Sequence, residues 1–313
     1  MKKKKRTYSY LPDDCWESIF KFIGNEDDDN RSFNSLSLVS KQFPSITNSL
    51  LFSLTVKDAT VPFLSRLLKR FNNLSSLHII DDNFDNILSL TSPFPLKKLT
   101  SLAIYRNLTF PENWLRAFSQ NITTLTSLTC YRMFLNNKHL LLIADCFPFL
   151  KELNLLYPWF SSQTNFINGI QSLLSKCWCI KHLNIRSTYF LKDQHVARIS
   201  LFHGDLVSIN LSYCSRLSES ALFSIVRNCP SLSEIKMENT AIGKKSVENS
   251  GVYPQLKSLK FTNSNSADHQ LKFSRILSFT YRTTNRSPTQ IQQQHKAHEL
   301  IFNTSRKTES CLR

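Results

Sequence analysis

Tyrosine and arginine residues recur at a regular interval through the middle of the chain, and both residue types are suited to binding another protein. The residues concerned are Tyr105, Arg106, Tyr131, Arg132, Tyr157 and Arg186. Tyrosine rings and guanidinium groups dominate the binding hot spots of protein surfaces, and the guanidinium fork matches a carboxylate or a phosphate. If the fold gathers these side chains on one face, we expect a substrate-binding patch for an acidic or phosphorylated segment of a protein.

Other residues offer little chemistry. The chain has only 5 glycines among 313 residues, so no local segment can form the glycine-rich loop that cradles a nucleotide phosphate. The sequence contains no HExxH motif, no paired-carboxylate signature and no recognisable nucleophile with its base. We therefore expect no catalytic residues, no cofactor and no enzymatic activity of the chain itself.

The 8 cysteines are expected to be reduced and mostly buried, because a chain of this length without a secretory signal favours free thiols. Cys177 and Cys179 have CxC spacing with no second pair nearby, and His295 and His298 lie in a polar segment. Zinc sites of the common type need two such pairs, so we predict no metal site.

The positive charge of the chain lies mainly at its two ends. The formal net charge is +16, and ten of these charges fall within residues 1–10 and 265–313. The body is therefore only mildly basic, which argues against nucleic acid as the partner. No stretch is apolar enough to span a bilayer, so we expect no membrane association. The opening MKKKKR is either a nuclear-import signal or a solvated tail.

A six-residue pattern, LxxLx followed by an apolar residue, returns nine times. Its first residues are Leu51, Leu74, Leu99, Leu125, Leu150, Ile180, Leu206, Leu232 and Leu256, at intervals of 23 to 30 residues. Alternating apolar residues in its second half predict a short strand. Counting the first residue of each hexamer as one, the tyrosines and arginines named above fall at positions seven and eight. Neighbouring strands lie about 5 Å apart, so the repeat would gather them on one sheet face.

The segments between hexamers predict helices. After Ser218, a suitable N-cap, the inward residues are Ala221, Leu222, Ile225 and Val226. After Pro62 they are Phe63, Leu64, Leu67, Leu68 and Phe71. A strand and a helix of about 26 residues cannot bury their own apolar faces, so adjacent repeats must stack into a solenoid.

Residues 206–232, LVSINLSYCSRLSESALFSIVRNCPSL, resemble a leucine-rich repeat of the plant-like, cysteine-containing type, with Cys214 after the strand and Cys229-Pro230 leading into the next repeat. Other repeats carry Asn107, Met133, Pro158, Thr188 or Thr240 at the position of Cys214.

Residues 11–50 do not follow the repeat, and they resemble an F-box. The resemblance rests on Leu11-Pro12, on Ile19 and on the string LSLVSKQF at residues 36–43, in which Phe43 stands where the family usually has Trp. It implies a three-helix module that binds a Skp-type adaptor. The residues implied for adaptor binding are Leu11, Pro12, Ile19, Leu38 and Val39.

Together the resemblances imply an α/β fold: a three-helix F-box followed by a leucine-rich-repeat solenoid, a curved parallel sheet with helices on its convex side. The expected organisation is a basic tail (1–10), an F-box (11–50), about nine repeats (51–263) and a disordered polar tail (264–313). The repeats stop without a capping unit, so we also expect the chain to be a truncated form of a longer repeat array.

The implied function is that of a substrate receptor in a Skp-cullin-F-box ubiquitin ligase, in the nucleus or the cytoplasm. The F-box would dock the adaptor, and through it a cullin, while the repeats hold a protein target. Two other functions stay open at this stage. The chain could be a free-standing protein-interaction scaffold, or it could bind nucleic acid through its basic ends. The Tyr-Arg patch also has an alternative as a solvated face without a ligand, because only two repeats carry the full pair.

Overall fold

The computed structural model of the chain describes residues 11–24, 35–71, 73–80, 87, 90–91, 93–105, 110–160, 163–242 and 258–260. The two tails expected at residues 1–10 and 264–313 lie outside these ranges, and so does Arg106. Within the described ranges, no helix has the length and apolar character that a membrane span requires.

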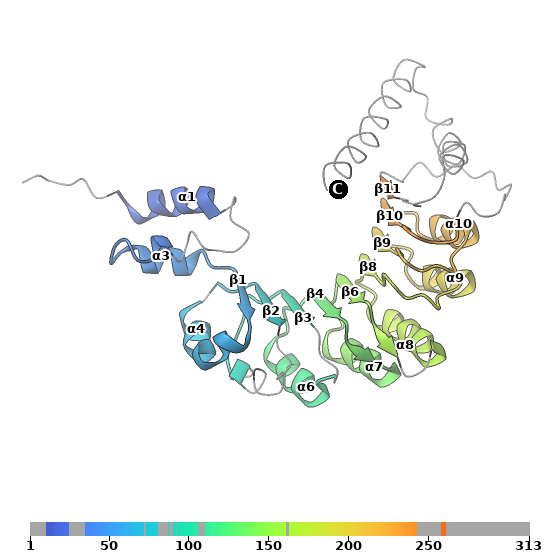
Figure 1. Cartoon of the computed structure of the whole chain (residues 1–313), viewed down its shortest axis with the longest axis horizontal. Helices are drawn as coiled ribbons and strands as arrows, with labels where there is room; N and C mark the ends of the chain where they lie inside the picture. The colour runs from blue at the N-terminus through green and yellow to red at the C-terminus, as the bar shows by residue number, and fades with distance from the viewer. Residues whose placement is uncertain are drawn as a thin grey trace, which may run out of the picture.

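One parallel sheet runs through the repeats (Figure 1). Its strands are β1 (Ser53–Val56), β2 (Ser76–Ile80), β3 (Ser101–Tyr105), β4 (Ser127–Tyr131), β6 (Glu152–Leu156), β8 (His182–Asn184), β9 (Ser208–Asn210), β10 (Glu234–Lys236) and β11 (Ser258–Lys260). Each strand begins at position three of a predicted hexamer. Position three of one strand pairs with position three of the next, from Ser53 with Ser76 to Glu234 with Ser258. Residues at equal positions therefore form straight columns across the sheet.

Helices cover the outer side of the arc, and the sheet lines its inner side (Figure 1). They are the 3₁₀ helix η1 (Asp58–Phe63), α4 (Leu64–Arg70), α6 (Glu112–Asn121), α7 (Asn137–Cys146), α8 (Gln163–Lys176), α9 (Asp193–Phe202) and α10 (Glu219–Asn228). The described repeats thus form an α/β solenoid, a curved parallel sheet with helices on its convex side, as the sequence predicts. Two short strands, β5 (Phe134–Leu135) and β7 (Trp159–Phe160), pair beside the main sheet.

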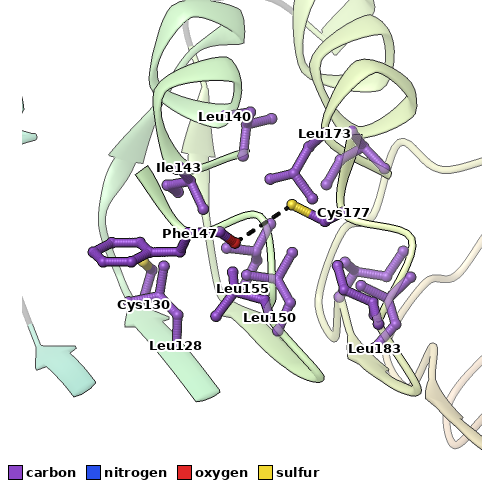
Figure 2. Close-up of a cluster of buried hydrophobic side chains, with 14 of the residues drawn as sticks. Leu128, Cys130, Leu140, Ile143, Phe147, Leu150, Leu155, Leu173, Cys177 and Leu183 are labelled. Atoms are coloured by element: carbon purple, nitrogen blue, oxygen red, sulfur yellow. Dashed lines mark hydrogen bonds between the residues drawn. The ribbon is translucent and has the colours of Figure 1, made fainter. Parts of the chain in front are cut away.

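The core lies between the sheet and the helices, because the residues at positions four and six of the repeats that contain β1 to β10 are buried there. Figure 2 shows one section of it, where Leu128 and Cys130 of β4 meet Leu140 and Ile143 of α7. The thiol of Cys177 donates to the carbonyl oxygen of Phe147 at 3.7 Å (Figure 2). The cysteines that precede the next strand are thus part of the packing between repeats.

A left-handed residue follows the strand in five consecutive repeats. Arg132, Tyr157, Ser187, Tyr213 and Asn239, all at position eight, have φ between 50° and 67°. The turn buries the side chain at position nine, which is Met133, Pro158, Thr188, Cys214 or Thr240. The hydroxyl groups of the two threonines donate to the carbonyl three residues earlier, Thr188 to Ile185 at 2.7 Å and Thr240 to Met237 at 3.0 Å. Position nine therefore needs a small or apolar side chain, and cysteine is one of several that fit.

Two of the predicted helices can be compared residue by residue. In α10 the Ser218 hydroxyl accepts from the Ser220 amide, and all four predicted inward residues are buried, so that prediction is confirmed. The helix after Pro62 begins as η1 and becomes α4 only at Leu64. Phe63 lies at this junction and is 50% exposed, so its predicted burial was wrong. The tighter 3₁₀ turn rotates its side chain outward, where Arg66 lies over the ring.

The N-terminal module contains α1 (Asp13–Gly24) and α3 (Phe43–Ser49). Its core is formed by Phe20, Phe43, Ile46 and Leu50, with Trp16 and Leu36 packed against them. The rings of Phe20 and Phe43 meet edge to face with centroids 4.9 Å apart. Residues 35 and 36 are also helical, but they adjoin the undescribed residues 25–34. The three-helix form of the module therefore stays a prediction.

The left-handed turns give a first prediction. A residue with a Cβ in this conformation costs about 1 to 2 kcal/mol, and the Ser187 hydroxyl is buried without a hydrogen-bond partner in the described part of the chain. We expect Ser187→Gly to be about 1 kcal/mol more stable to urea than Ser187→Ala, which removes the hydroxyl but keeps the Cβ. Equal stability of the two variants would contradict a left-handed residue at this position.

Candidate functional site

The structure brings the predicted tyrosines together at the carboxyl ends of the strands. Tyr105 ends β3 and is paired in register with Tyr131, which ends β4, and their ring centroids are 5.7 Å apart. Tyr157 follows β6 and meets the ring of Tyr131 edge to face at 5.6 Å. Because Tyr157 is left-handed, its side chain from position eight joins a row built from position seven in the preceding strands.

Two arginines complete this row. The guanidinium carbon of Arg132 lies 5.5 Å from the ring centroid of Tyr131 and 5.8 Å from that of Tyr157. The guanidinium carbon of Arg186 lies 5.8 Å from Tyr157 and 4.5 Å from Tyr213. The side chains thus form one continuous row of rings and cations, which we call the Tyr-Arg ladder. Its members are Tyr105, Tyr131, Arg132, Tyr157, Arg186 and Tyr213.

The ladder differs from the predicted patch at two residues. Arg106 was predicted to belong to it and lies outside the described residues. Tyr213 was not among the predicted residues, although it occupies position eight of its repeat, as Arg132 and Tyr157 do. Its contact with Arg186 depends on the left-handed turn, which spacing alone does not reveal.

Asparagines at position five fix the backbone that carries Arg186. The Asn184 side-chain oxygen accepts from the Arg186 amide at 3.2 Å, and Asn210 does the same for the Ser212 amide at 3.0 Å. Such local bonds compete with the strand ladder, and β8 and β9 end at these two asparagines. The chain then turns, and Arg186 is held beside Tyr157.

The cations of the ladder have no carboxylate partner in the described part of the chain, where neither Arg132 nor Arg186 forms an ion pair. The Nε–H of Arg186 is buried and donates to no acceptor there. Two acids of the inner face are already engaged: Glu152 accepts from Ser127 and Asn154, and Glu234 pairs with Lys236 at 3.0 Å. The ladder is therefore a locally positive surface.

Four of the cysteines, Cys130, Cys177, Cys214 and Cys229, are buried core residues rather than reactive groups. Burial raises the pKa of Cys130, Cys177 and Cys214 to about 12 and that of Cys229 to about 11. Each thiol is therefore protonated at neutral pH. Among the described residues, no cluster of three or more potential metal ligands occurs. At one end of the ladder, burial lowers the pKa of His78, so this ring is neutral at pH 7.

The residues predicted to bind an adaptor are exposed on the N-terminal module. The exposed fraction is 44% for Leu11, 41% for Ile19, 88% for Leu38 and 69% for Val39, and Pro12 is exposed as well. Trp16 and Phe20 of α1 face the module's own core instead. The helix thus has two apolar stripes, one packed and one uncovered, and Phe22 extends the uncovered one at 73% exposure.

A hydrogen bond links the start of α1 to the start of α3, and it lies close in sequence to four of the residues predicted to bind the adaptor. The Gln42 side-chain amide donates to the Asp13 carboxylate. Leu11 and Pro12 directly precede Asp13, and Leu38 and Val39 lie shortly before Gln42. The two exposed apolar segments are therefore neighbours, although 25 residues separate them in the sequence.

No family model matches the chain. Three solved structures resemble it in part. A chain from the crystal structure of the yeast Rad7 and Elc1 complex has 13% identity and a TM-score of 0.41, over 73% of this chain and 77% of that chain. Internalin C2 from Listeria monocytogenes has 14% identity and a TM-score of 0.40, over 70% and 84%. TLR13 in complex with ssRNA13 has 14% identity and a TM-score of 0.37, over 63% of this chain and 34% of that chain. The repeat fold follows from the strand order and register of the chain itself, independently of these similarities.

The two stripes of α1 give a second prediction, which separates folding from exposure. Phe20→Ala removes a ring that is 1% exposed and should destabilise the module by about 3 to 5 kcal/mol. Leu38→Asp changes an exposed side chain and should alter its stability by less than about 0.5 kcal/mol. Hydrogen exchange of residues 13–24 measures both effects. Fast exchange in the Leu38→Asp variant would show that Leu38 supports the module's own core.

Proposed function

We propose that the chain is the substrate-recognition subunit of a Skp-cullin-F-box ubiquitin ligase. The observation that carries the proposal is the set of uncovered apolar side chains on the N-terminal module. Full burial of an exposed aliphatic side chain contributes about 1.5 to 3 kcal/mol. A partner can supply most of this contribution at Leu38 and Val39, which are 88% and 69% exposed, and a smaller part of it at Leu11 and Ile19, which are 44% and 41% exposed. A partner protein that covers Leu11, Ile19, Leu38 and Val39 accounts for them.

The solenoid supports the second half of the proposal. Repeat solenoids offer an extended concave surface to binding partners, and the inner face of this one carries the Tyr-Arg ladder. The chain would perform no bond chemistry. It would hold a protein target near a conjugating enzyme that transfers ubiquitin, so that proximity provides the rate enhancement.

Adaptor binding is the test of this function. We expect the wild-type chain to co-purify with a Skp-type adaptor and Leu38→Asp, Val39→Asp to bind it at least a hundredfold more weakly, because two buried aliphatic contacts are lost and two charges are desolvated. Ile19→Asp should have a similar effect. The matched control is Leu201→Asp on α9, where Leu201 is 72% exposed, and this variant should bind as the wild type does.

If the wild-type chain does not bind the adaptor, or if the double variant binds it as well as the control, the ligase function is wrong. The chain would then be a free-standing protein-interaction scaffold. In that alternative the solenoid would still bind a protein target, but the N-terminal module would not bind an adaptor.

A further inference from the structure

A second row of side chains runs beside the Tyr-Arg ladder. Phe134, Trp159 and Tyr189 lie two residues after Arg132, Tyr157 and Ser187 in consecutive repeats, and they are 37%, 60% and 58% exposed. Phe134 and Trp159 are paired in register between β5 and β7, so the small second sheet holds them side by side. We call these three residues the aromatic rim.

The ladder and the rim together combine charge with apolar surface over β4, β6 and β8. Contiguous exposed aromatic side chains mark interaction sites. The positive charges of Arg132 and Arg186 have no carboxylate partner in the described ranges, and guanidinium groups form strong hydrogen bonds with anionic oxygens. A bound molecule that supplies both anionic oxygens and apolar groups complements this surface.

The spacing of the two cations defines the shape of that molecule. Arg132 follows β4 and Arg186 follows β8, with β6 between them, so their backbones are about 10 Å apart at the usual strand spacing. The Tyr157 ring lies 5.8 Å from both guanidinium carbons. In an extended polyproline-II segment, residues three apart share a face at about 9 Å. Two anionic side chains at i and i+3 would therefore reach both arginines.

The acids of the inner face disfavour a nucleic acid here. Glu152 is the first residue of β6, at position three of its repeat. Glu238 lies at position seven of the repeat that contains β10, which is two strands beyond β8 and Arg186. A nucleic acid carries a phosphate at every nucleotide and needs a continuous basic track. A surface with two cations flanked by carboxylates instead suits a segment with few, spaced anionic groups.

We propose that the Tyr-Arg ladder and the aromatic rim bind an extended protein segment that lies across β4, β6 and β8. The segment places two anionic side chains, three residues apart, on Arg132 and Arg186, and it packs large apolar side chains on Phe134, Trp159 and Tyr189. Both carboxylate and phosphoserine groups supply the required anionic oxygens. The identity of the segment as part of a ubiquitination target rests on the proposed function, whereas the binding itself does not.

The experiment is a selection of random 12-residue peptides, displayed on phage, against the full chain without any adaptor. The test variant is Arg132→Gln, Arg186→Gln. The matched control is Arg198→Gln, Arg227→Gln, which removes two exposed arginines from α9 and α10 on the outer side. Circular dichroism and urea unfolding check that both double variants remain folded.

We expect the wild type and the control to select peptides with Asp or Glu at i and i+3 beside Leu, Phe or Trp, and the test variant to lose them. A selected peptide, once synthesised, should bind at least tenfold more weakly after either single Arg→Gln change and after Trp159→Ala. Replacing its two acids by Gln should abolish binding, and phosphoserine at both places should restore an arginine-dependent affinity.

Three outcomes would overturn the proposal: no peptide selected above background, peptides without the acidic pair, or an equal yield from the test variant. Tighter arginine-dependent binding of a single-stranded oligonucleotide than of any selected peptide would assign the surface to nucleic acid instead. Because no adaptor is present, the peptide selection can be interpreted even if the chain does not bind a Skp-type adaptor. The adaptor-binding test can likewise be interpreted if no peptide is selected.

Discussion

Burial of the apolar residues at positions four and six is the constraint on which the rest of the structure depends. A single strand and helix cannot cover these side chains, so each repeat must stack on the next. Stacking succeeds only with the strands in register, since a shift of one residue would turn the apolar set toward solvent. The pairing of Ser53 with Ser76, repeated through Glu234 and Ser258, is the result. As a result, residues at the same position of successive repeats line up across the inner face. This alignment allows the side chains of the Tyr-Arg ladder to contact one another.

The turn that follows β4, β6, β8, β9 and β10 determines which side chains this regular sheet presents at its carboxyl edge. Its left-handed residue at position eight redirects the chain, and its buried residue at position nine holds the turn against the core. The turn constrains the backbone conformation at position eight and the side-chain volume at position nine. The exposed side chains at positions seven, eight and ten are therefore free to vary. In the repeats from Leu125 to Leu206, eight of these twelve positions carry tyrosine, arginine, phenylalanine or tryptophan, and the other four carry Leu156, Ser187, Ser212 and Ser215. Most of the residue types that suit binding therefore lie outside the positions that the packing between repeats fixes.

Two apolar surfaces of the described residues, the exposed stripe of the N-terminal module and the aromatic rim, differ in their surroundings. The exposed stripe of the N-terminal module is purely aliphatic and aromatic at Leu11, Ile19, Phe22, Leu38 and Val39, which suits a large dry interface. The aromatic rim of the solenoid lies beside two unpaired guanidinium groups, which suits a segment with both charge and apolar groups. Under the proposed function, the first surface would hold a constant partner and the second a specific target.

The sequence by itself determined the repeat and the place of each main-sheet strand within it, because repeats of about 26 residues with alternating apolar positions can bury those positions only by stacking on one another. It also identified the spacing that brings Tyr105, Tyr131 and Tyr157 together. Only the tertiary structure decided which stripe of α1 is packed, since Ile19 and Phe20 are equally apolar and the choice depends on Phe43 from α3. The left-handed turn that brings Tyr213 against Arg186 and the 3₁₀ turn that exposes Phe63 were likewise decided by the tertiary structure, because the spacing of side chains in the sequence does not reveal backbone dihedral angles.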